Sequence, residues 1–523
     1  MKVLLVYPPR RKDPFFYPPT SLLYIAQAIK DYGHDAKIID IPYLLEKHPD
    51  KFSLMDNSIY DYILKEDFDL LGLGGVVSTY FFYDDFVNRI RQLKKDIPII
   101  AGGTVGFPIK DVWEKYAPVD YLVNGDGEIV IKKLLGCLQH ADHDAIKKIP
   151  GLCYLNNGKY TCVAPEEITD LDSIPYLNYD SVDYDYYINE LSKFIENIIP
   201  DRTKVKYKQL RALPLLTSRG CPFECKFCFH FTRKHRYHSI DYVIGNIKYL
   251  KNKYGINFFY IVDDLFNLNK KRTIDLCETI HKASLDIQFF AGGGKPSLVT
   301  GEVLAAMKKA GFVRFSYGIE SGSQKMLDIM NKKTTVQQNL NALKLAEEHG
   351  ISGFANIVFG MPGEDFNTIN ETRDFLIRAG VSSNKFSYAW ATAYPGAPLF
   401  QYMLDNGLVA DIRKYLFDVG SPGYYIHNFT DLPFRKLEEK VKKIVLEVDL
   451  AYYKGMKDYK KIWPILLKMS AIEMFYSLPE KLQNDIRGKV SGMFSLLRKK
   501  KATTKSSSHH IEEYVTKRKA KIF

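Results

Sequence analysis

The sequence contains no uninterrupted apolar run of about 18 residues, the length that a membrane-spanning helix requires. We therefore expect no transmembrane helix, and the apolar run at residues 1–9 is too brief for a signal peptide. Cysteine is scarce too, with seven among 523 residues. Four of these lie far apart without any repeat spacing: Cys137, Cys153, Cys162 and Cys277. This pattern favours a chain kept reduced in the cytoplasm over a disulfide scaffold.

The charge is not balanced, and the formal net charge is +12. A basic chain suits anionic partners such as membrane surfaces or phosphorylated substrates, and the alternative is that the charge serves solubility alone. Basic patches interleaved with aromatic residues are not evident, so we expect no nucleic-acid partner. The length predicts two to four domains, and a hydrophobic fraction of 46% is enough for large cores.

The remaining three cysteines lie close together, at Cys221, Cys225 and Cys228. They follow an expected buried strand, 213–217, and a glycine turn. Three thiolates on one loop can hold a cubane iron–sulfur cluster and leave one iron open for a substrate or cofactor. A zinc site is the alternative, but structural zinc normally has four ligands. His230 is the nearest candidate for a fourth ligand, and it is only two residues beyond Cys228.

The spacing C-x3-C-x2-C, with the aromatic Phe227 before the last cysteine, resembles the signature of the radical S-adenosylmethionine (SAM) superfamily. The resemblance implies a [4Fe-4S] cluster held by Cys221, Cys225 and Cys228, which are both metal ligands and catalytic residues. It also implies that the open iron chelates the methionine part of SAM. One electron then cleaves SAM to a 5′-deoxyadenosyl radical, so an electron donor of the flavodoxin or ferredoxin type is expected.

Residues 1–150 alternate apolar runs with amphipathic stretches. This alternation predicts an α/β domain with a doubly wound parallel sheet of the Rossmann-like type. The expected strands are 3–7, 36–40, 70–74, 97–101 and 121–124, with 152–155 as a further candidate. Ligands of such sheets bind beyond the carboxyl ends of the strands.

Glycine-rich turns follow several of these strands, and together with the Pro-Pro near the first strand they resemble the cobalamin-binding domain that precedes many radical SAM domains. The resemblance implies cobalamin as a cofactor, with contacts from Tyr17, Ser78, Thr79, Gly102, Gly103, Gly125 and Glu128. The Asp-x-His-x-x-Gly motif that supplies a histidine to cobalt elsewhere is absent. His34 is expected in a surface turn, so the lower base would be displaced with no histidine replacing it.

Residues 151–205 read as an irregular linker, rich in Asp, Tyr and Pro. Residues 206–400 then show strand candidates at 213–217, 258–262, 287–291, 313–318, 355–359 and 386–391, separated by helical patterns. Six such units predict a partial (β/α)6 barrel of the TIM type, open on one side. In β/α barrels the reactive groups lie at the carboxyl ends of the strands.

The polar residues after these strands are the candidates for contacts with SAM. Similarity to the family assigns the ammonium group of SAM to Asp263 and Asp264, and the alternative for this pair is a helix cap. It assigns the ribose to Glu320 of the Gly318-Ile319-Glu320-Ser321 turn. Met361 and Pro362 would line the adenine, and the alternative is a simple Pro-Gly turn. Relatives often carry an arginine where this chain has Lys295, and lysine offers one point charge instead of a fork.

Residues 401–497 predict a helical region, and 498–523 a basic and disordered tail. The apolar stretch 462–469, flanked by lysines, fits either a helix packed on the open side of the barrel or one lying on a membrane surface.

Together these features predict a radical SAM enzyme that methylates an unactivated carbon of a small molecule, with a lean toward a lipid or tetrapyrrole. A radical oxidative cyclase with the same cofactors is the alternative. A zinc or nucleic-acid-binding protein is the rival from another class.

Overall fold

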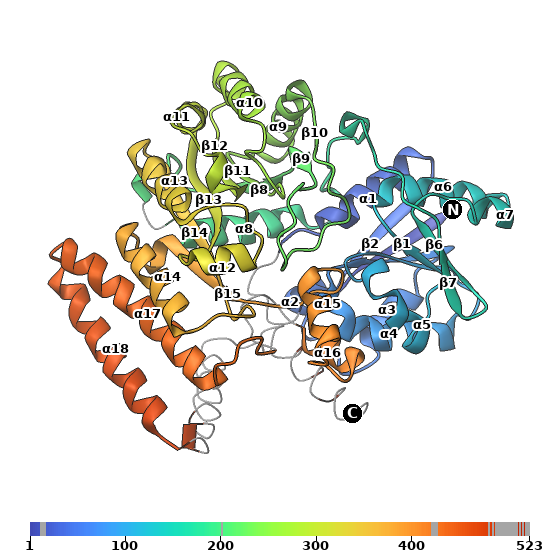
Figure 1. Cartoon of the computed structure of the whole chain (residues 1–523). Coiled ribbons are helices and arrows are strands. Elements are labelled where there is room, and N and C mark those ends of the chain that lie inside the picture. The colour runs from blue at the N-terminus through green and yellow to red at the C-terminus, as the bar shows by residue number, and fades with distance from the viewer. Residues whose placement is uncertain are drawn as a thin grey trace.

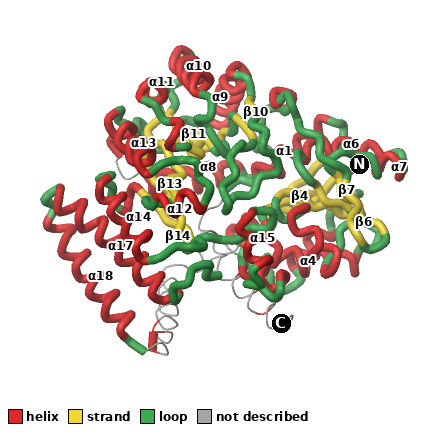
Figure 2. The backbone as a smooth tube through the Cα atoms, in the orientation of Figure 1, coloured by secondary structure: helices red, strands yellow, loops and turns green. Residues whose placement is uncertain are grey.

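The computed structural model describes residues 1–10, 17–199, 202–419 and 427–479, together with isolated positions beyond 479. Two β-sheets lie at the centre of these residues and helices cover them (Figure 1). The strands of the two sheets form separate groups in Figure 2. Apart from isolated positions, the basic tail expected at 498–523 lies outside the described residues.

The first sheet has seven strands in the order β2-β1-β3-β4-β5-β6-β7. Its parallel strands are β1 (Lys2–Tyr7), β2 (Asp35–Asp40), β3 (Leu70–Gly75), β4 (Ile99–Gly103) and β5 (Tyr121–Val123). An antiparallel hairpin of β6 (Leu152–Asn156) and β7 (Lys159–Cys162) extends one edge. From β1 the chain first adds β2 on one side and then returns to add β3 on the other side. The boundary between β1 and β3 is therefore the switch point of a doubly wound sheet.

Helices cover both faces of this sheet because alternate side chains of its strands point to opposite sides. Val3, Leu5 and Tyr7 of β1 join one core, and Leu4 and Val6 join the other. The helices are α1 (Thr20–Asp31), α2 (Ile41–Lys47), α3 (Ser58–Leu64), α4 (Tyr80–Leu93), α5 (Lys110–Tyr116), α6 (Gly127–Gln139) and α7 (His143–Ile146). The expectation of a doubly wound sheet is confirmed.

The second sheet has six parallel strands in the order β15-β14-β13-β12-β11-β8, and its two edge strands do not pair with each other. They are β8 (Ala212–Leu215), β11 (Phe258–Ile261), β12 (Gln288–Gly294), β13 (Phe312–Glu320), β14 (Ser352–Phe359) and β15 (Phe386–Trp390). The helices between them are α9 (Ile240–Tyr254), α10 (Lys270–Lys282), α11 (Gly301–Lys309), α12 (Gln324–Ile329), α13 (Val336–Glu348) and α14 (Phe366–Arg378). All six expected strands are present, and the partial barrel is confirmed.

The helices of the second sheet begin where the sequence supplies caps. At α13, the Thr335 hydroxyl accepts the Gln338 N–H and the Gln338 side chain accepts the Thr335 N–H. At α14, Asp365 and Thr368 make the same reciprocal pair. Such boxes satisfy backbone donors that a first turn leaves without intrahelical partners. They therefore set where each helix starts relative to the preceding strand.

The other elements connect the sheets or cover their edges. They are α8 (Tyr184–Ile198), the two-residue hairpin strands β9 (Ser218–Arg219) and β10 (Arg236–Tyr237), α15 (Pro398–Asp405), α16 (Ile412–Asp418), α17 (Phe434–Gly455) and α18 (Tyr459–Ser477). After β15 the chain returns to the first sheet, where Arg413 of α16 pairs through both Nε and Nη2 with the buried Asp84 of α4. The α17–α18 hairpin projects at the outer edge of the second sheet (Figure 1).

Two expectations for the first sheet need correction. The cysteine pattern predicts a chain kept reduced, but the β6–β7 hairpin places Cys153 directly opposite Cys162 and a disulfide joins them. His34 does lie in a turn, yet its side chain is buried, with Nδ1 at 3.1 Å from the Met1 amino nitrogen. Burial lowers the pKa of His34. The residue precedes β2 and so lies at the amino-terminal edge of the sheet.

Candidate active site

The three motif cysteines lie on the loop between β9 and β10, beyond the carboxyl end of β8. The thiols of Cys221 and Cys225 are buried, and that of Cys228 is half-buried. The backbone N–H of Lys226 donates to the Met330 carbonyl at 3.0 Å, which fixes the loop against the end of α12. Gly220 has a φ of +87°, and a Cβ there would lie 2.4 Å from the Lys234 carbonyl oxygen. Only glycine fits this entry to the loop.

The donor chemistry of the loop fits an iron–sulfur cluster. Three thiols on one loop can supply three thiolate ligands, although burial in the absence of a metal raises the pKa of each thiol. The Lys332 ammonium opposes this shift at each of the three cysteines. Within the described residues, no three His, Cys, Asp or Glu side chains are grouped so as to hold a single metal ion.

Lys332 forms a nearly buried ion pair beside these thiols. Its Nζ lies 2.8 Å from Oε1 of Glu320, at the carboxyl end of β13. Burial alone would lower the pKa of Lys332, but Glu320 holds it above the ordinary value. Gly318 makes the pair possible, since a Cβ there would lie 2.5 Å from Glu320 Oε1 and 2.6 Å from Lys332 Nζ. Glu320 itself has a φ of +62°, which is uncommon for a residue with a side chain.

Lys295 is a second buried cation in the same region. Its Nζ donates to the Lys332 carbonyl at 2.7 Å and lies 3.8 Å from the centroid of the Phe223 ring. Burial lowers the pKa of Lys295 to about 8. The sequence does not indicate Lys332 at all, because a lysine in Asn331-Lys332-Lys333 reads as part of an exposed turn.

The two aspartates after β11 have different surroundings. The Asp263 carboxylate is buried and accepts bonds from Thr217 N at 2.6 Å, Thr217 Oγ1 at 2.5 Å and Ser218 Oγ at 2.7 Å. It therefore holds the strand that leads into the cysteine loop and is not free to accept the ammonium group of a ligand. Asp264 is exposed and accepts the Gly220 N–H at 3.1 Å, so it is the carboxylate of the pair that lies next to the loop.

The other candidates near the second sheet are placed as follows. Ser321 is buried, with Oγ 3.0 Å from Thr372 Oγ1. Phe227 packs against the core that contains Leu4 and Val6 of β1. Met361 is buried in that core, while Pro362 begins an adjacent turn. Glu364 is buried as well, and desolvation raises its pKa to about 8. Glu364 follows Pro362-Gly363 in a turn after β14, and an acid at such a position is a signal that the sequence alone displays.

A cavity of about 350 Å³ lies at the carboxyl edge of the first sheet. Its walls combine glycines with apolar side chains, among them Gly74, Gly102, Gly103, Gly125, Leu22 and Ile131. A Cβ on Gly74 would lie 2.4 Å from Leu22 Cδ2, and one on Gly103 would lie 2.3 Å from the Gly75 carbonyl oxygen. Side chains at these positions would fill the cavity or displace its walls, so the glycines create the space.

The predicted contacts on this sheet divide into two groups. Gly102, Gly103, Gly125 and Glu128 line the cavity. Tyr17, Ser78 and Thr79 do not: the Thr79 hydroxyl donates to the Val76 carbonyl at 2.7 Å, and Tyr17 packs edge-on against Phe194 of α8. Leu216 and Arg219 also line the cavity although they follow β8, so the cavity lies between the two sheets.

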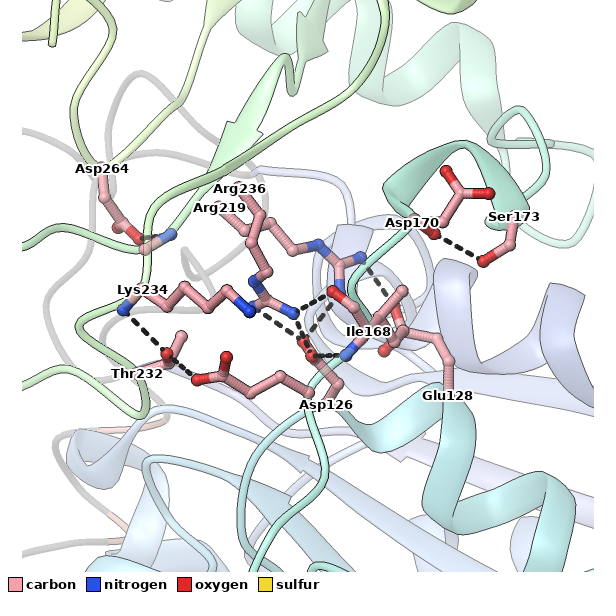
Figure 3. Close-up of polar contacts among 12 residues, drawn as sticks. Asp126, Glu128, Ile168, Asp170, Ser173, Arg219, Thr232, Lys234, Arg236 and Asp264 are labelled. Carbon is pink, nitrogen blue, oxygen red and sulfur yellow. Dashed lines mark hydrogen bonds and ion pairs between the residues drawn. The ribbon is translucent and has the colours of Figure 1, made fainter.

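A group of ion pairs joins the turn after β5 to the β9–β10 hairpin (Figure 3). Arg219 Nη2 lies 2.6 Å from Glu128 Oε1, and its Nη1 lies 3.2 Å from Asp126 Oδ1. Arg236 Nη1 lies 2.5 Å from Asp126 Oδ2. The two arginines face each other on β9 and β10, so the shared carboxylate of Asp126 offsets their repulsion. Arg219 lines the cavity and stands two residues before Cys221, so the wall of the cavity continues along the chain into the cysteine loop.

Three cysteines on one loop beyond a parallel half-barrel fit the ligand set of an iron–sulfur site. Residues 215–376 match the family model described as the radical SAM superfamily. This segment is a radical SAM domain. Such a domain implies a [4Fe-4S] cluster and SAM, and the three thiols fit the cluster.

Relatives and a solved structure extend this likeness beyond the matched segment. The chain is 29% identical over 463 residues to an uncharacterized methyltransferase of Pyrococcus horikoshii, covering 87% of this chain and 92% of the relative. It is 26% identical over 408 residues to the anaerobic magnesium-protoporphyrin IX monomethyl ester cyclase of Rubrivivax gelatinosus, covering 77% and 69%. The fold is similar to that of the radical SAM methyltransferase TsrM from Kitasatospora setae with cobalamin and a [4Fe-4S] cluster bound, with a TM-score of 0.60, 17% identity and coverage of 77% and 75%.

Proposed function

We propose that the chain binds cobalamin in the cavity of the first sheet and methylates an unactivated carbon of a small molecule. The observation that carries the proposal is the shared wall: Arg219 lines the glycine cavity and leads directly into the cysteine loop. When bound, the cluster and SAM supply hydrogen abstraction, and cobalamin supplies a methyl group. The names of the Pyrococcus and Kitasatospora proteins, both methyltransferases, support this choice.

Residues of the second sheet hold and orient SAM in this proposal. Cys221, Cys225 and Cys228 leave one iron of the cluster open. The carboxylate of Glu320 accepts hydrogen bonds from ribose hydroxyls, and Asp264 accepts the ammonium group in place of Asp263. Lys332 and Lys295 keep this region positive, which stabilises the thiolates and suits the carboxylate of SAM. The backbone at Met361 and Pro362 lines the adenine.

Residues of the first sheet hold one part of the corrinoid in this proposal. A cavity of about 350 Å³ is too small for the whole of cobalamin but has room for one of its arms. The flat glycine wall at Gly74, Gly102 and Gly103 lets a bulky ring system approach the backbone closely. His34 lies at the opposite edge of the sheet and is not a cobalt ligand in this proposal.

The proposed partners are a small-molecule substrate and a one-electron donor of the flavodoxin or ferredoxin type. Among the described helices, none is both long and apolar enough to span a bilayer. Oxidative ring closure with the same cofactors is the second candidate, because the Rubrivivax relative is named a cyclase. The two reactions differ in product mass: methylation adds one methylene unit, whereas ring closure removes hydrogen or adds oxygen.

The test is transfer of a labelled methyl group. Reconstituted protein would be loaded with hydroxocobalamin, reduced anaerobically and given SAM with a deuterated methyl group. We expect deuterated methylcobalamin together with S-adenosylhomocysteine, and less of both from the Gly103→Ala protein at a cobalamin concentration that does not saturate it. Cobalamin that stays bound but unmethylated would contradict methyl transfer and favour the oxidative reaction. Failure to bind cobalamin at all would contradict the proposed cavity.

A further inference from the structure

Helix α18, Tyr459–Ser477, is apolar on two opposite faces. One face packs on α17, with Ile465 buried and Ile462, Met469 and Ile472 half-buried. A helix that is apolar all round is normally buried on all sides. In α18 the second face is open, and the helix forms the outer edge of the projecting hairpin (Figure 1).

The open face carries a continuous line of large apolar side chains. The exposed fractions are 74% for Tyr459, 66% for Trp463, 57% for Leu467 and 67% for Met474. The spacings of four, four and seven residues place these side chains on one side of the helix. Met456 and Leu466 are exposed beside them. We call these six residues the α18 stripe.

The charges around the α18 stripe are mainly positive. Lys460 and Lys468 are exposed, and within the described residues neither has an ion-pair partner. The acidic Glu473 is paired with Lys443 of α17 at 3.4 Å. In the residues after 479, lysine and arginine also outnumber aspartate and glutamate. Neither these residues nor a second copy of this basic chain would complement the charge around the stripe.

We propose that α18 lies flat on a bilayer containing anionic lipid, with the α18 stripe in the boundary between headgroups and acyl chains. Tyr and Trp side chains suit this boundary because each has an apolar body and a polar tip. Lys460, which lies next to the stripe on the helix, contacts the anionic headgroups beside it. The helix packs on α17, which packs on α14 of the half-barrel, so binding brings the catalytic sheet to the membrane surface. The inference does not depend on the proposed methyl transfer.

Trp463 makes the inference directly measurable. The chain has three tryptophans, and the other two, Trp113 and Trp390, are buried. Without vesicles, we expect acrylamide to quench Trp463 freely. With vesicles of phosphatidylcholine and phosphatidylglycerol, the emission should shift to shorter wavelength and lipids brominated in their acyl chains should quench it. Vesicles of phosphatidylcholine alone should bind far more weakly, and salt should weaken binding to the anionic vesicles.

Leu467→Glu is the diagnostic variant, and Leu93→Glu is its matched control. Both leucines are 57% exposed, but Leu93 lies at the end of α4 on the first sheet. We expect Leu467→Glu to weaken co-sedimentation with anionic vesicles about tenfold, and Leu93→Glu to leave it unchanged. The melting temperature should not change in either case. Equal binding by all three proteins, or a Trp463 already shielded from acrylamide without lipid, would overturn the inference; shielding that depends on protein concentration would indicate a second copy instead.

Discussion

At the scale of single residues, Gly103 shows how the backbone creates the proposed corrinoid site. Its φ is +75°, and a Cβ would lie 2.3 Å from the Gly75 carbonyl oxygen. Both the conformation and the close approach therefore exclude a side chain. The double glycines after the third and fourth strands were predictable from the sequence. The contact between them was not, because it depends on the register that pairs Gly75 with Gly103.

We expect Gly103→Ala to lower the affinity for hydroxocobalamin at least tenfold, because the new methyl group displaces the wall of the cavity. Stability should fall by about 1–3 kcal/mol from backbone strain and crowding. Gly158→Ala is the matched control: it has a φ of +78°, yet nothing lies within 4 Å of its Cβ position. Binding titrations and thermal unfolding of both variants measure the two effects. Equal losses of affinity would show that strain alone, and not the cavity wall, is responsible.

Glu364 gives a prediction about pH. Burial raises its pKa to about 8, from an ordinary value of 4.5. The folded state therefore binds more protons than the unfolded state between these values, and the contribution of Glu364 to stability falls as the pH rises through that range. Glu364→Gln keeps an acceptor for the Gly360 N–H but does not ionise.

The stability of the Gln variant relative to the wild type should therefore increase from pH 6 to about pH 8.5. Urea unfolding at both values measures the difference. A difference that does not change with pH would show that Glu364 is already ionised in the folded protein at pH 6.

At the scale of elements, the β9–β10 hairpin depends on a residue from the other sheet. Asp126 accepts from the Ile168 N–H at 3.0 Å and pairs with both Arg219 and Arg236. Burial would raise the pKa of Asp126, but the two guanidinium groups and this hydrogen bond lower it overall. The turn Gly125-Asp126-Gly127-Glu128 was recognisable in the sequence, whereas its arginine partners lie about ninety residues or more further along the chain.

We expect Asp126→Asn to cost about 3 kcal/mol, because it leaves two facing arginines in a largely buried place without their shared carboxylate. The iron content after reconstitution should fall too, since β9 leads into the cysteine loop. Thermal unfolding and iron analysis measure the two effects. Asp67→Asn is the control, because its pair with Lys2 is exposed to solvent and should contribute little to stability. A loss of stability as small as that of the control would contradict a structural role for the ion pairs of Asp126 with Arg219 and Arg236.

At the scale of the whole molecule, periodicity and motif position were sufficient to predict both sheets. Every expected strand is present because each combines an apolar run with a turn at its carboxyl end. The Cys153–Cys162 disulfide was not predictable from spacing, since it depends on the register of an antiparallel hairpin. The sequence also showed no sign of the ion pairs made by Lys332, Arg219 and Arg236. An isolated basic residue carries no local signal of the carboxylate that it contacts in the fold.

The arrangement of the two sheets gives the central claim its physical basis. The carboxyl end of β8 and the carboxyl edge of the first sheet face the same cavity. A cofactor held by the loop after β8 and one held by the first sheet would therefore lie next to each other. The Asp84–Arg413 pair and the return of α15 and α16 to the first sheet hold the two halves together. Enzymes of this kind supply placement and exclusion of water, while the cofactors supply the reactive chemistry.

The most direct measurement is the iron, sulfide and cobalt content of one anaerobically purified and reconstituted sample. We expect about four iron and four sulfide ions per chain, together with one corrinoid. Replacing all three of Cys221, Cys225 and Cys228 by alanine should remove the iron and leave the cobalt. A folded wild-type protein that takes up neither iron nor sulfide, or a triple variant that keeps its iron, would contradict the account.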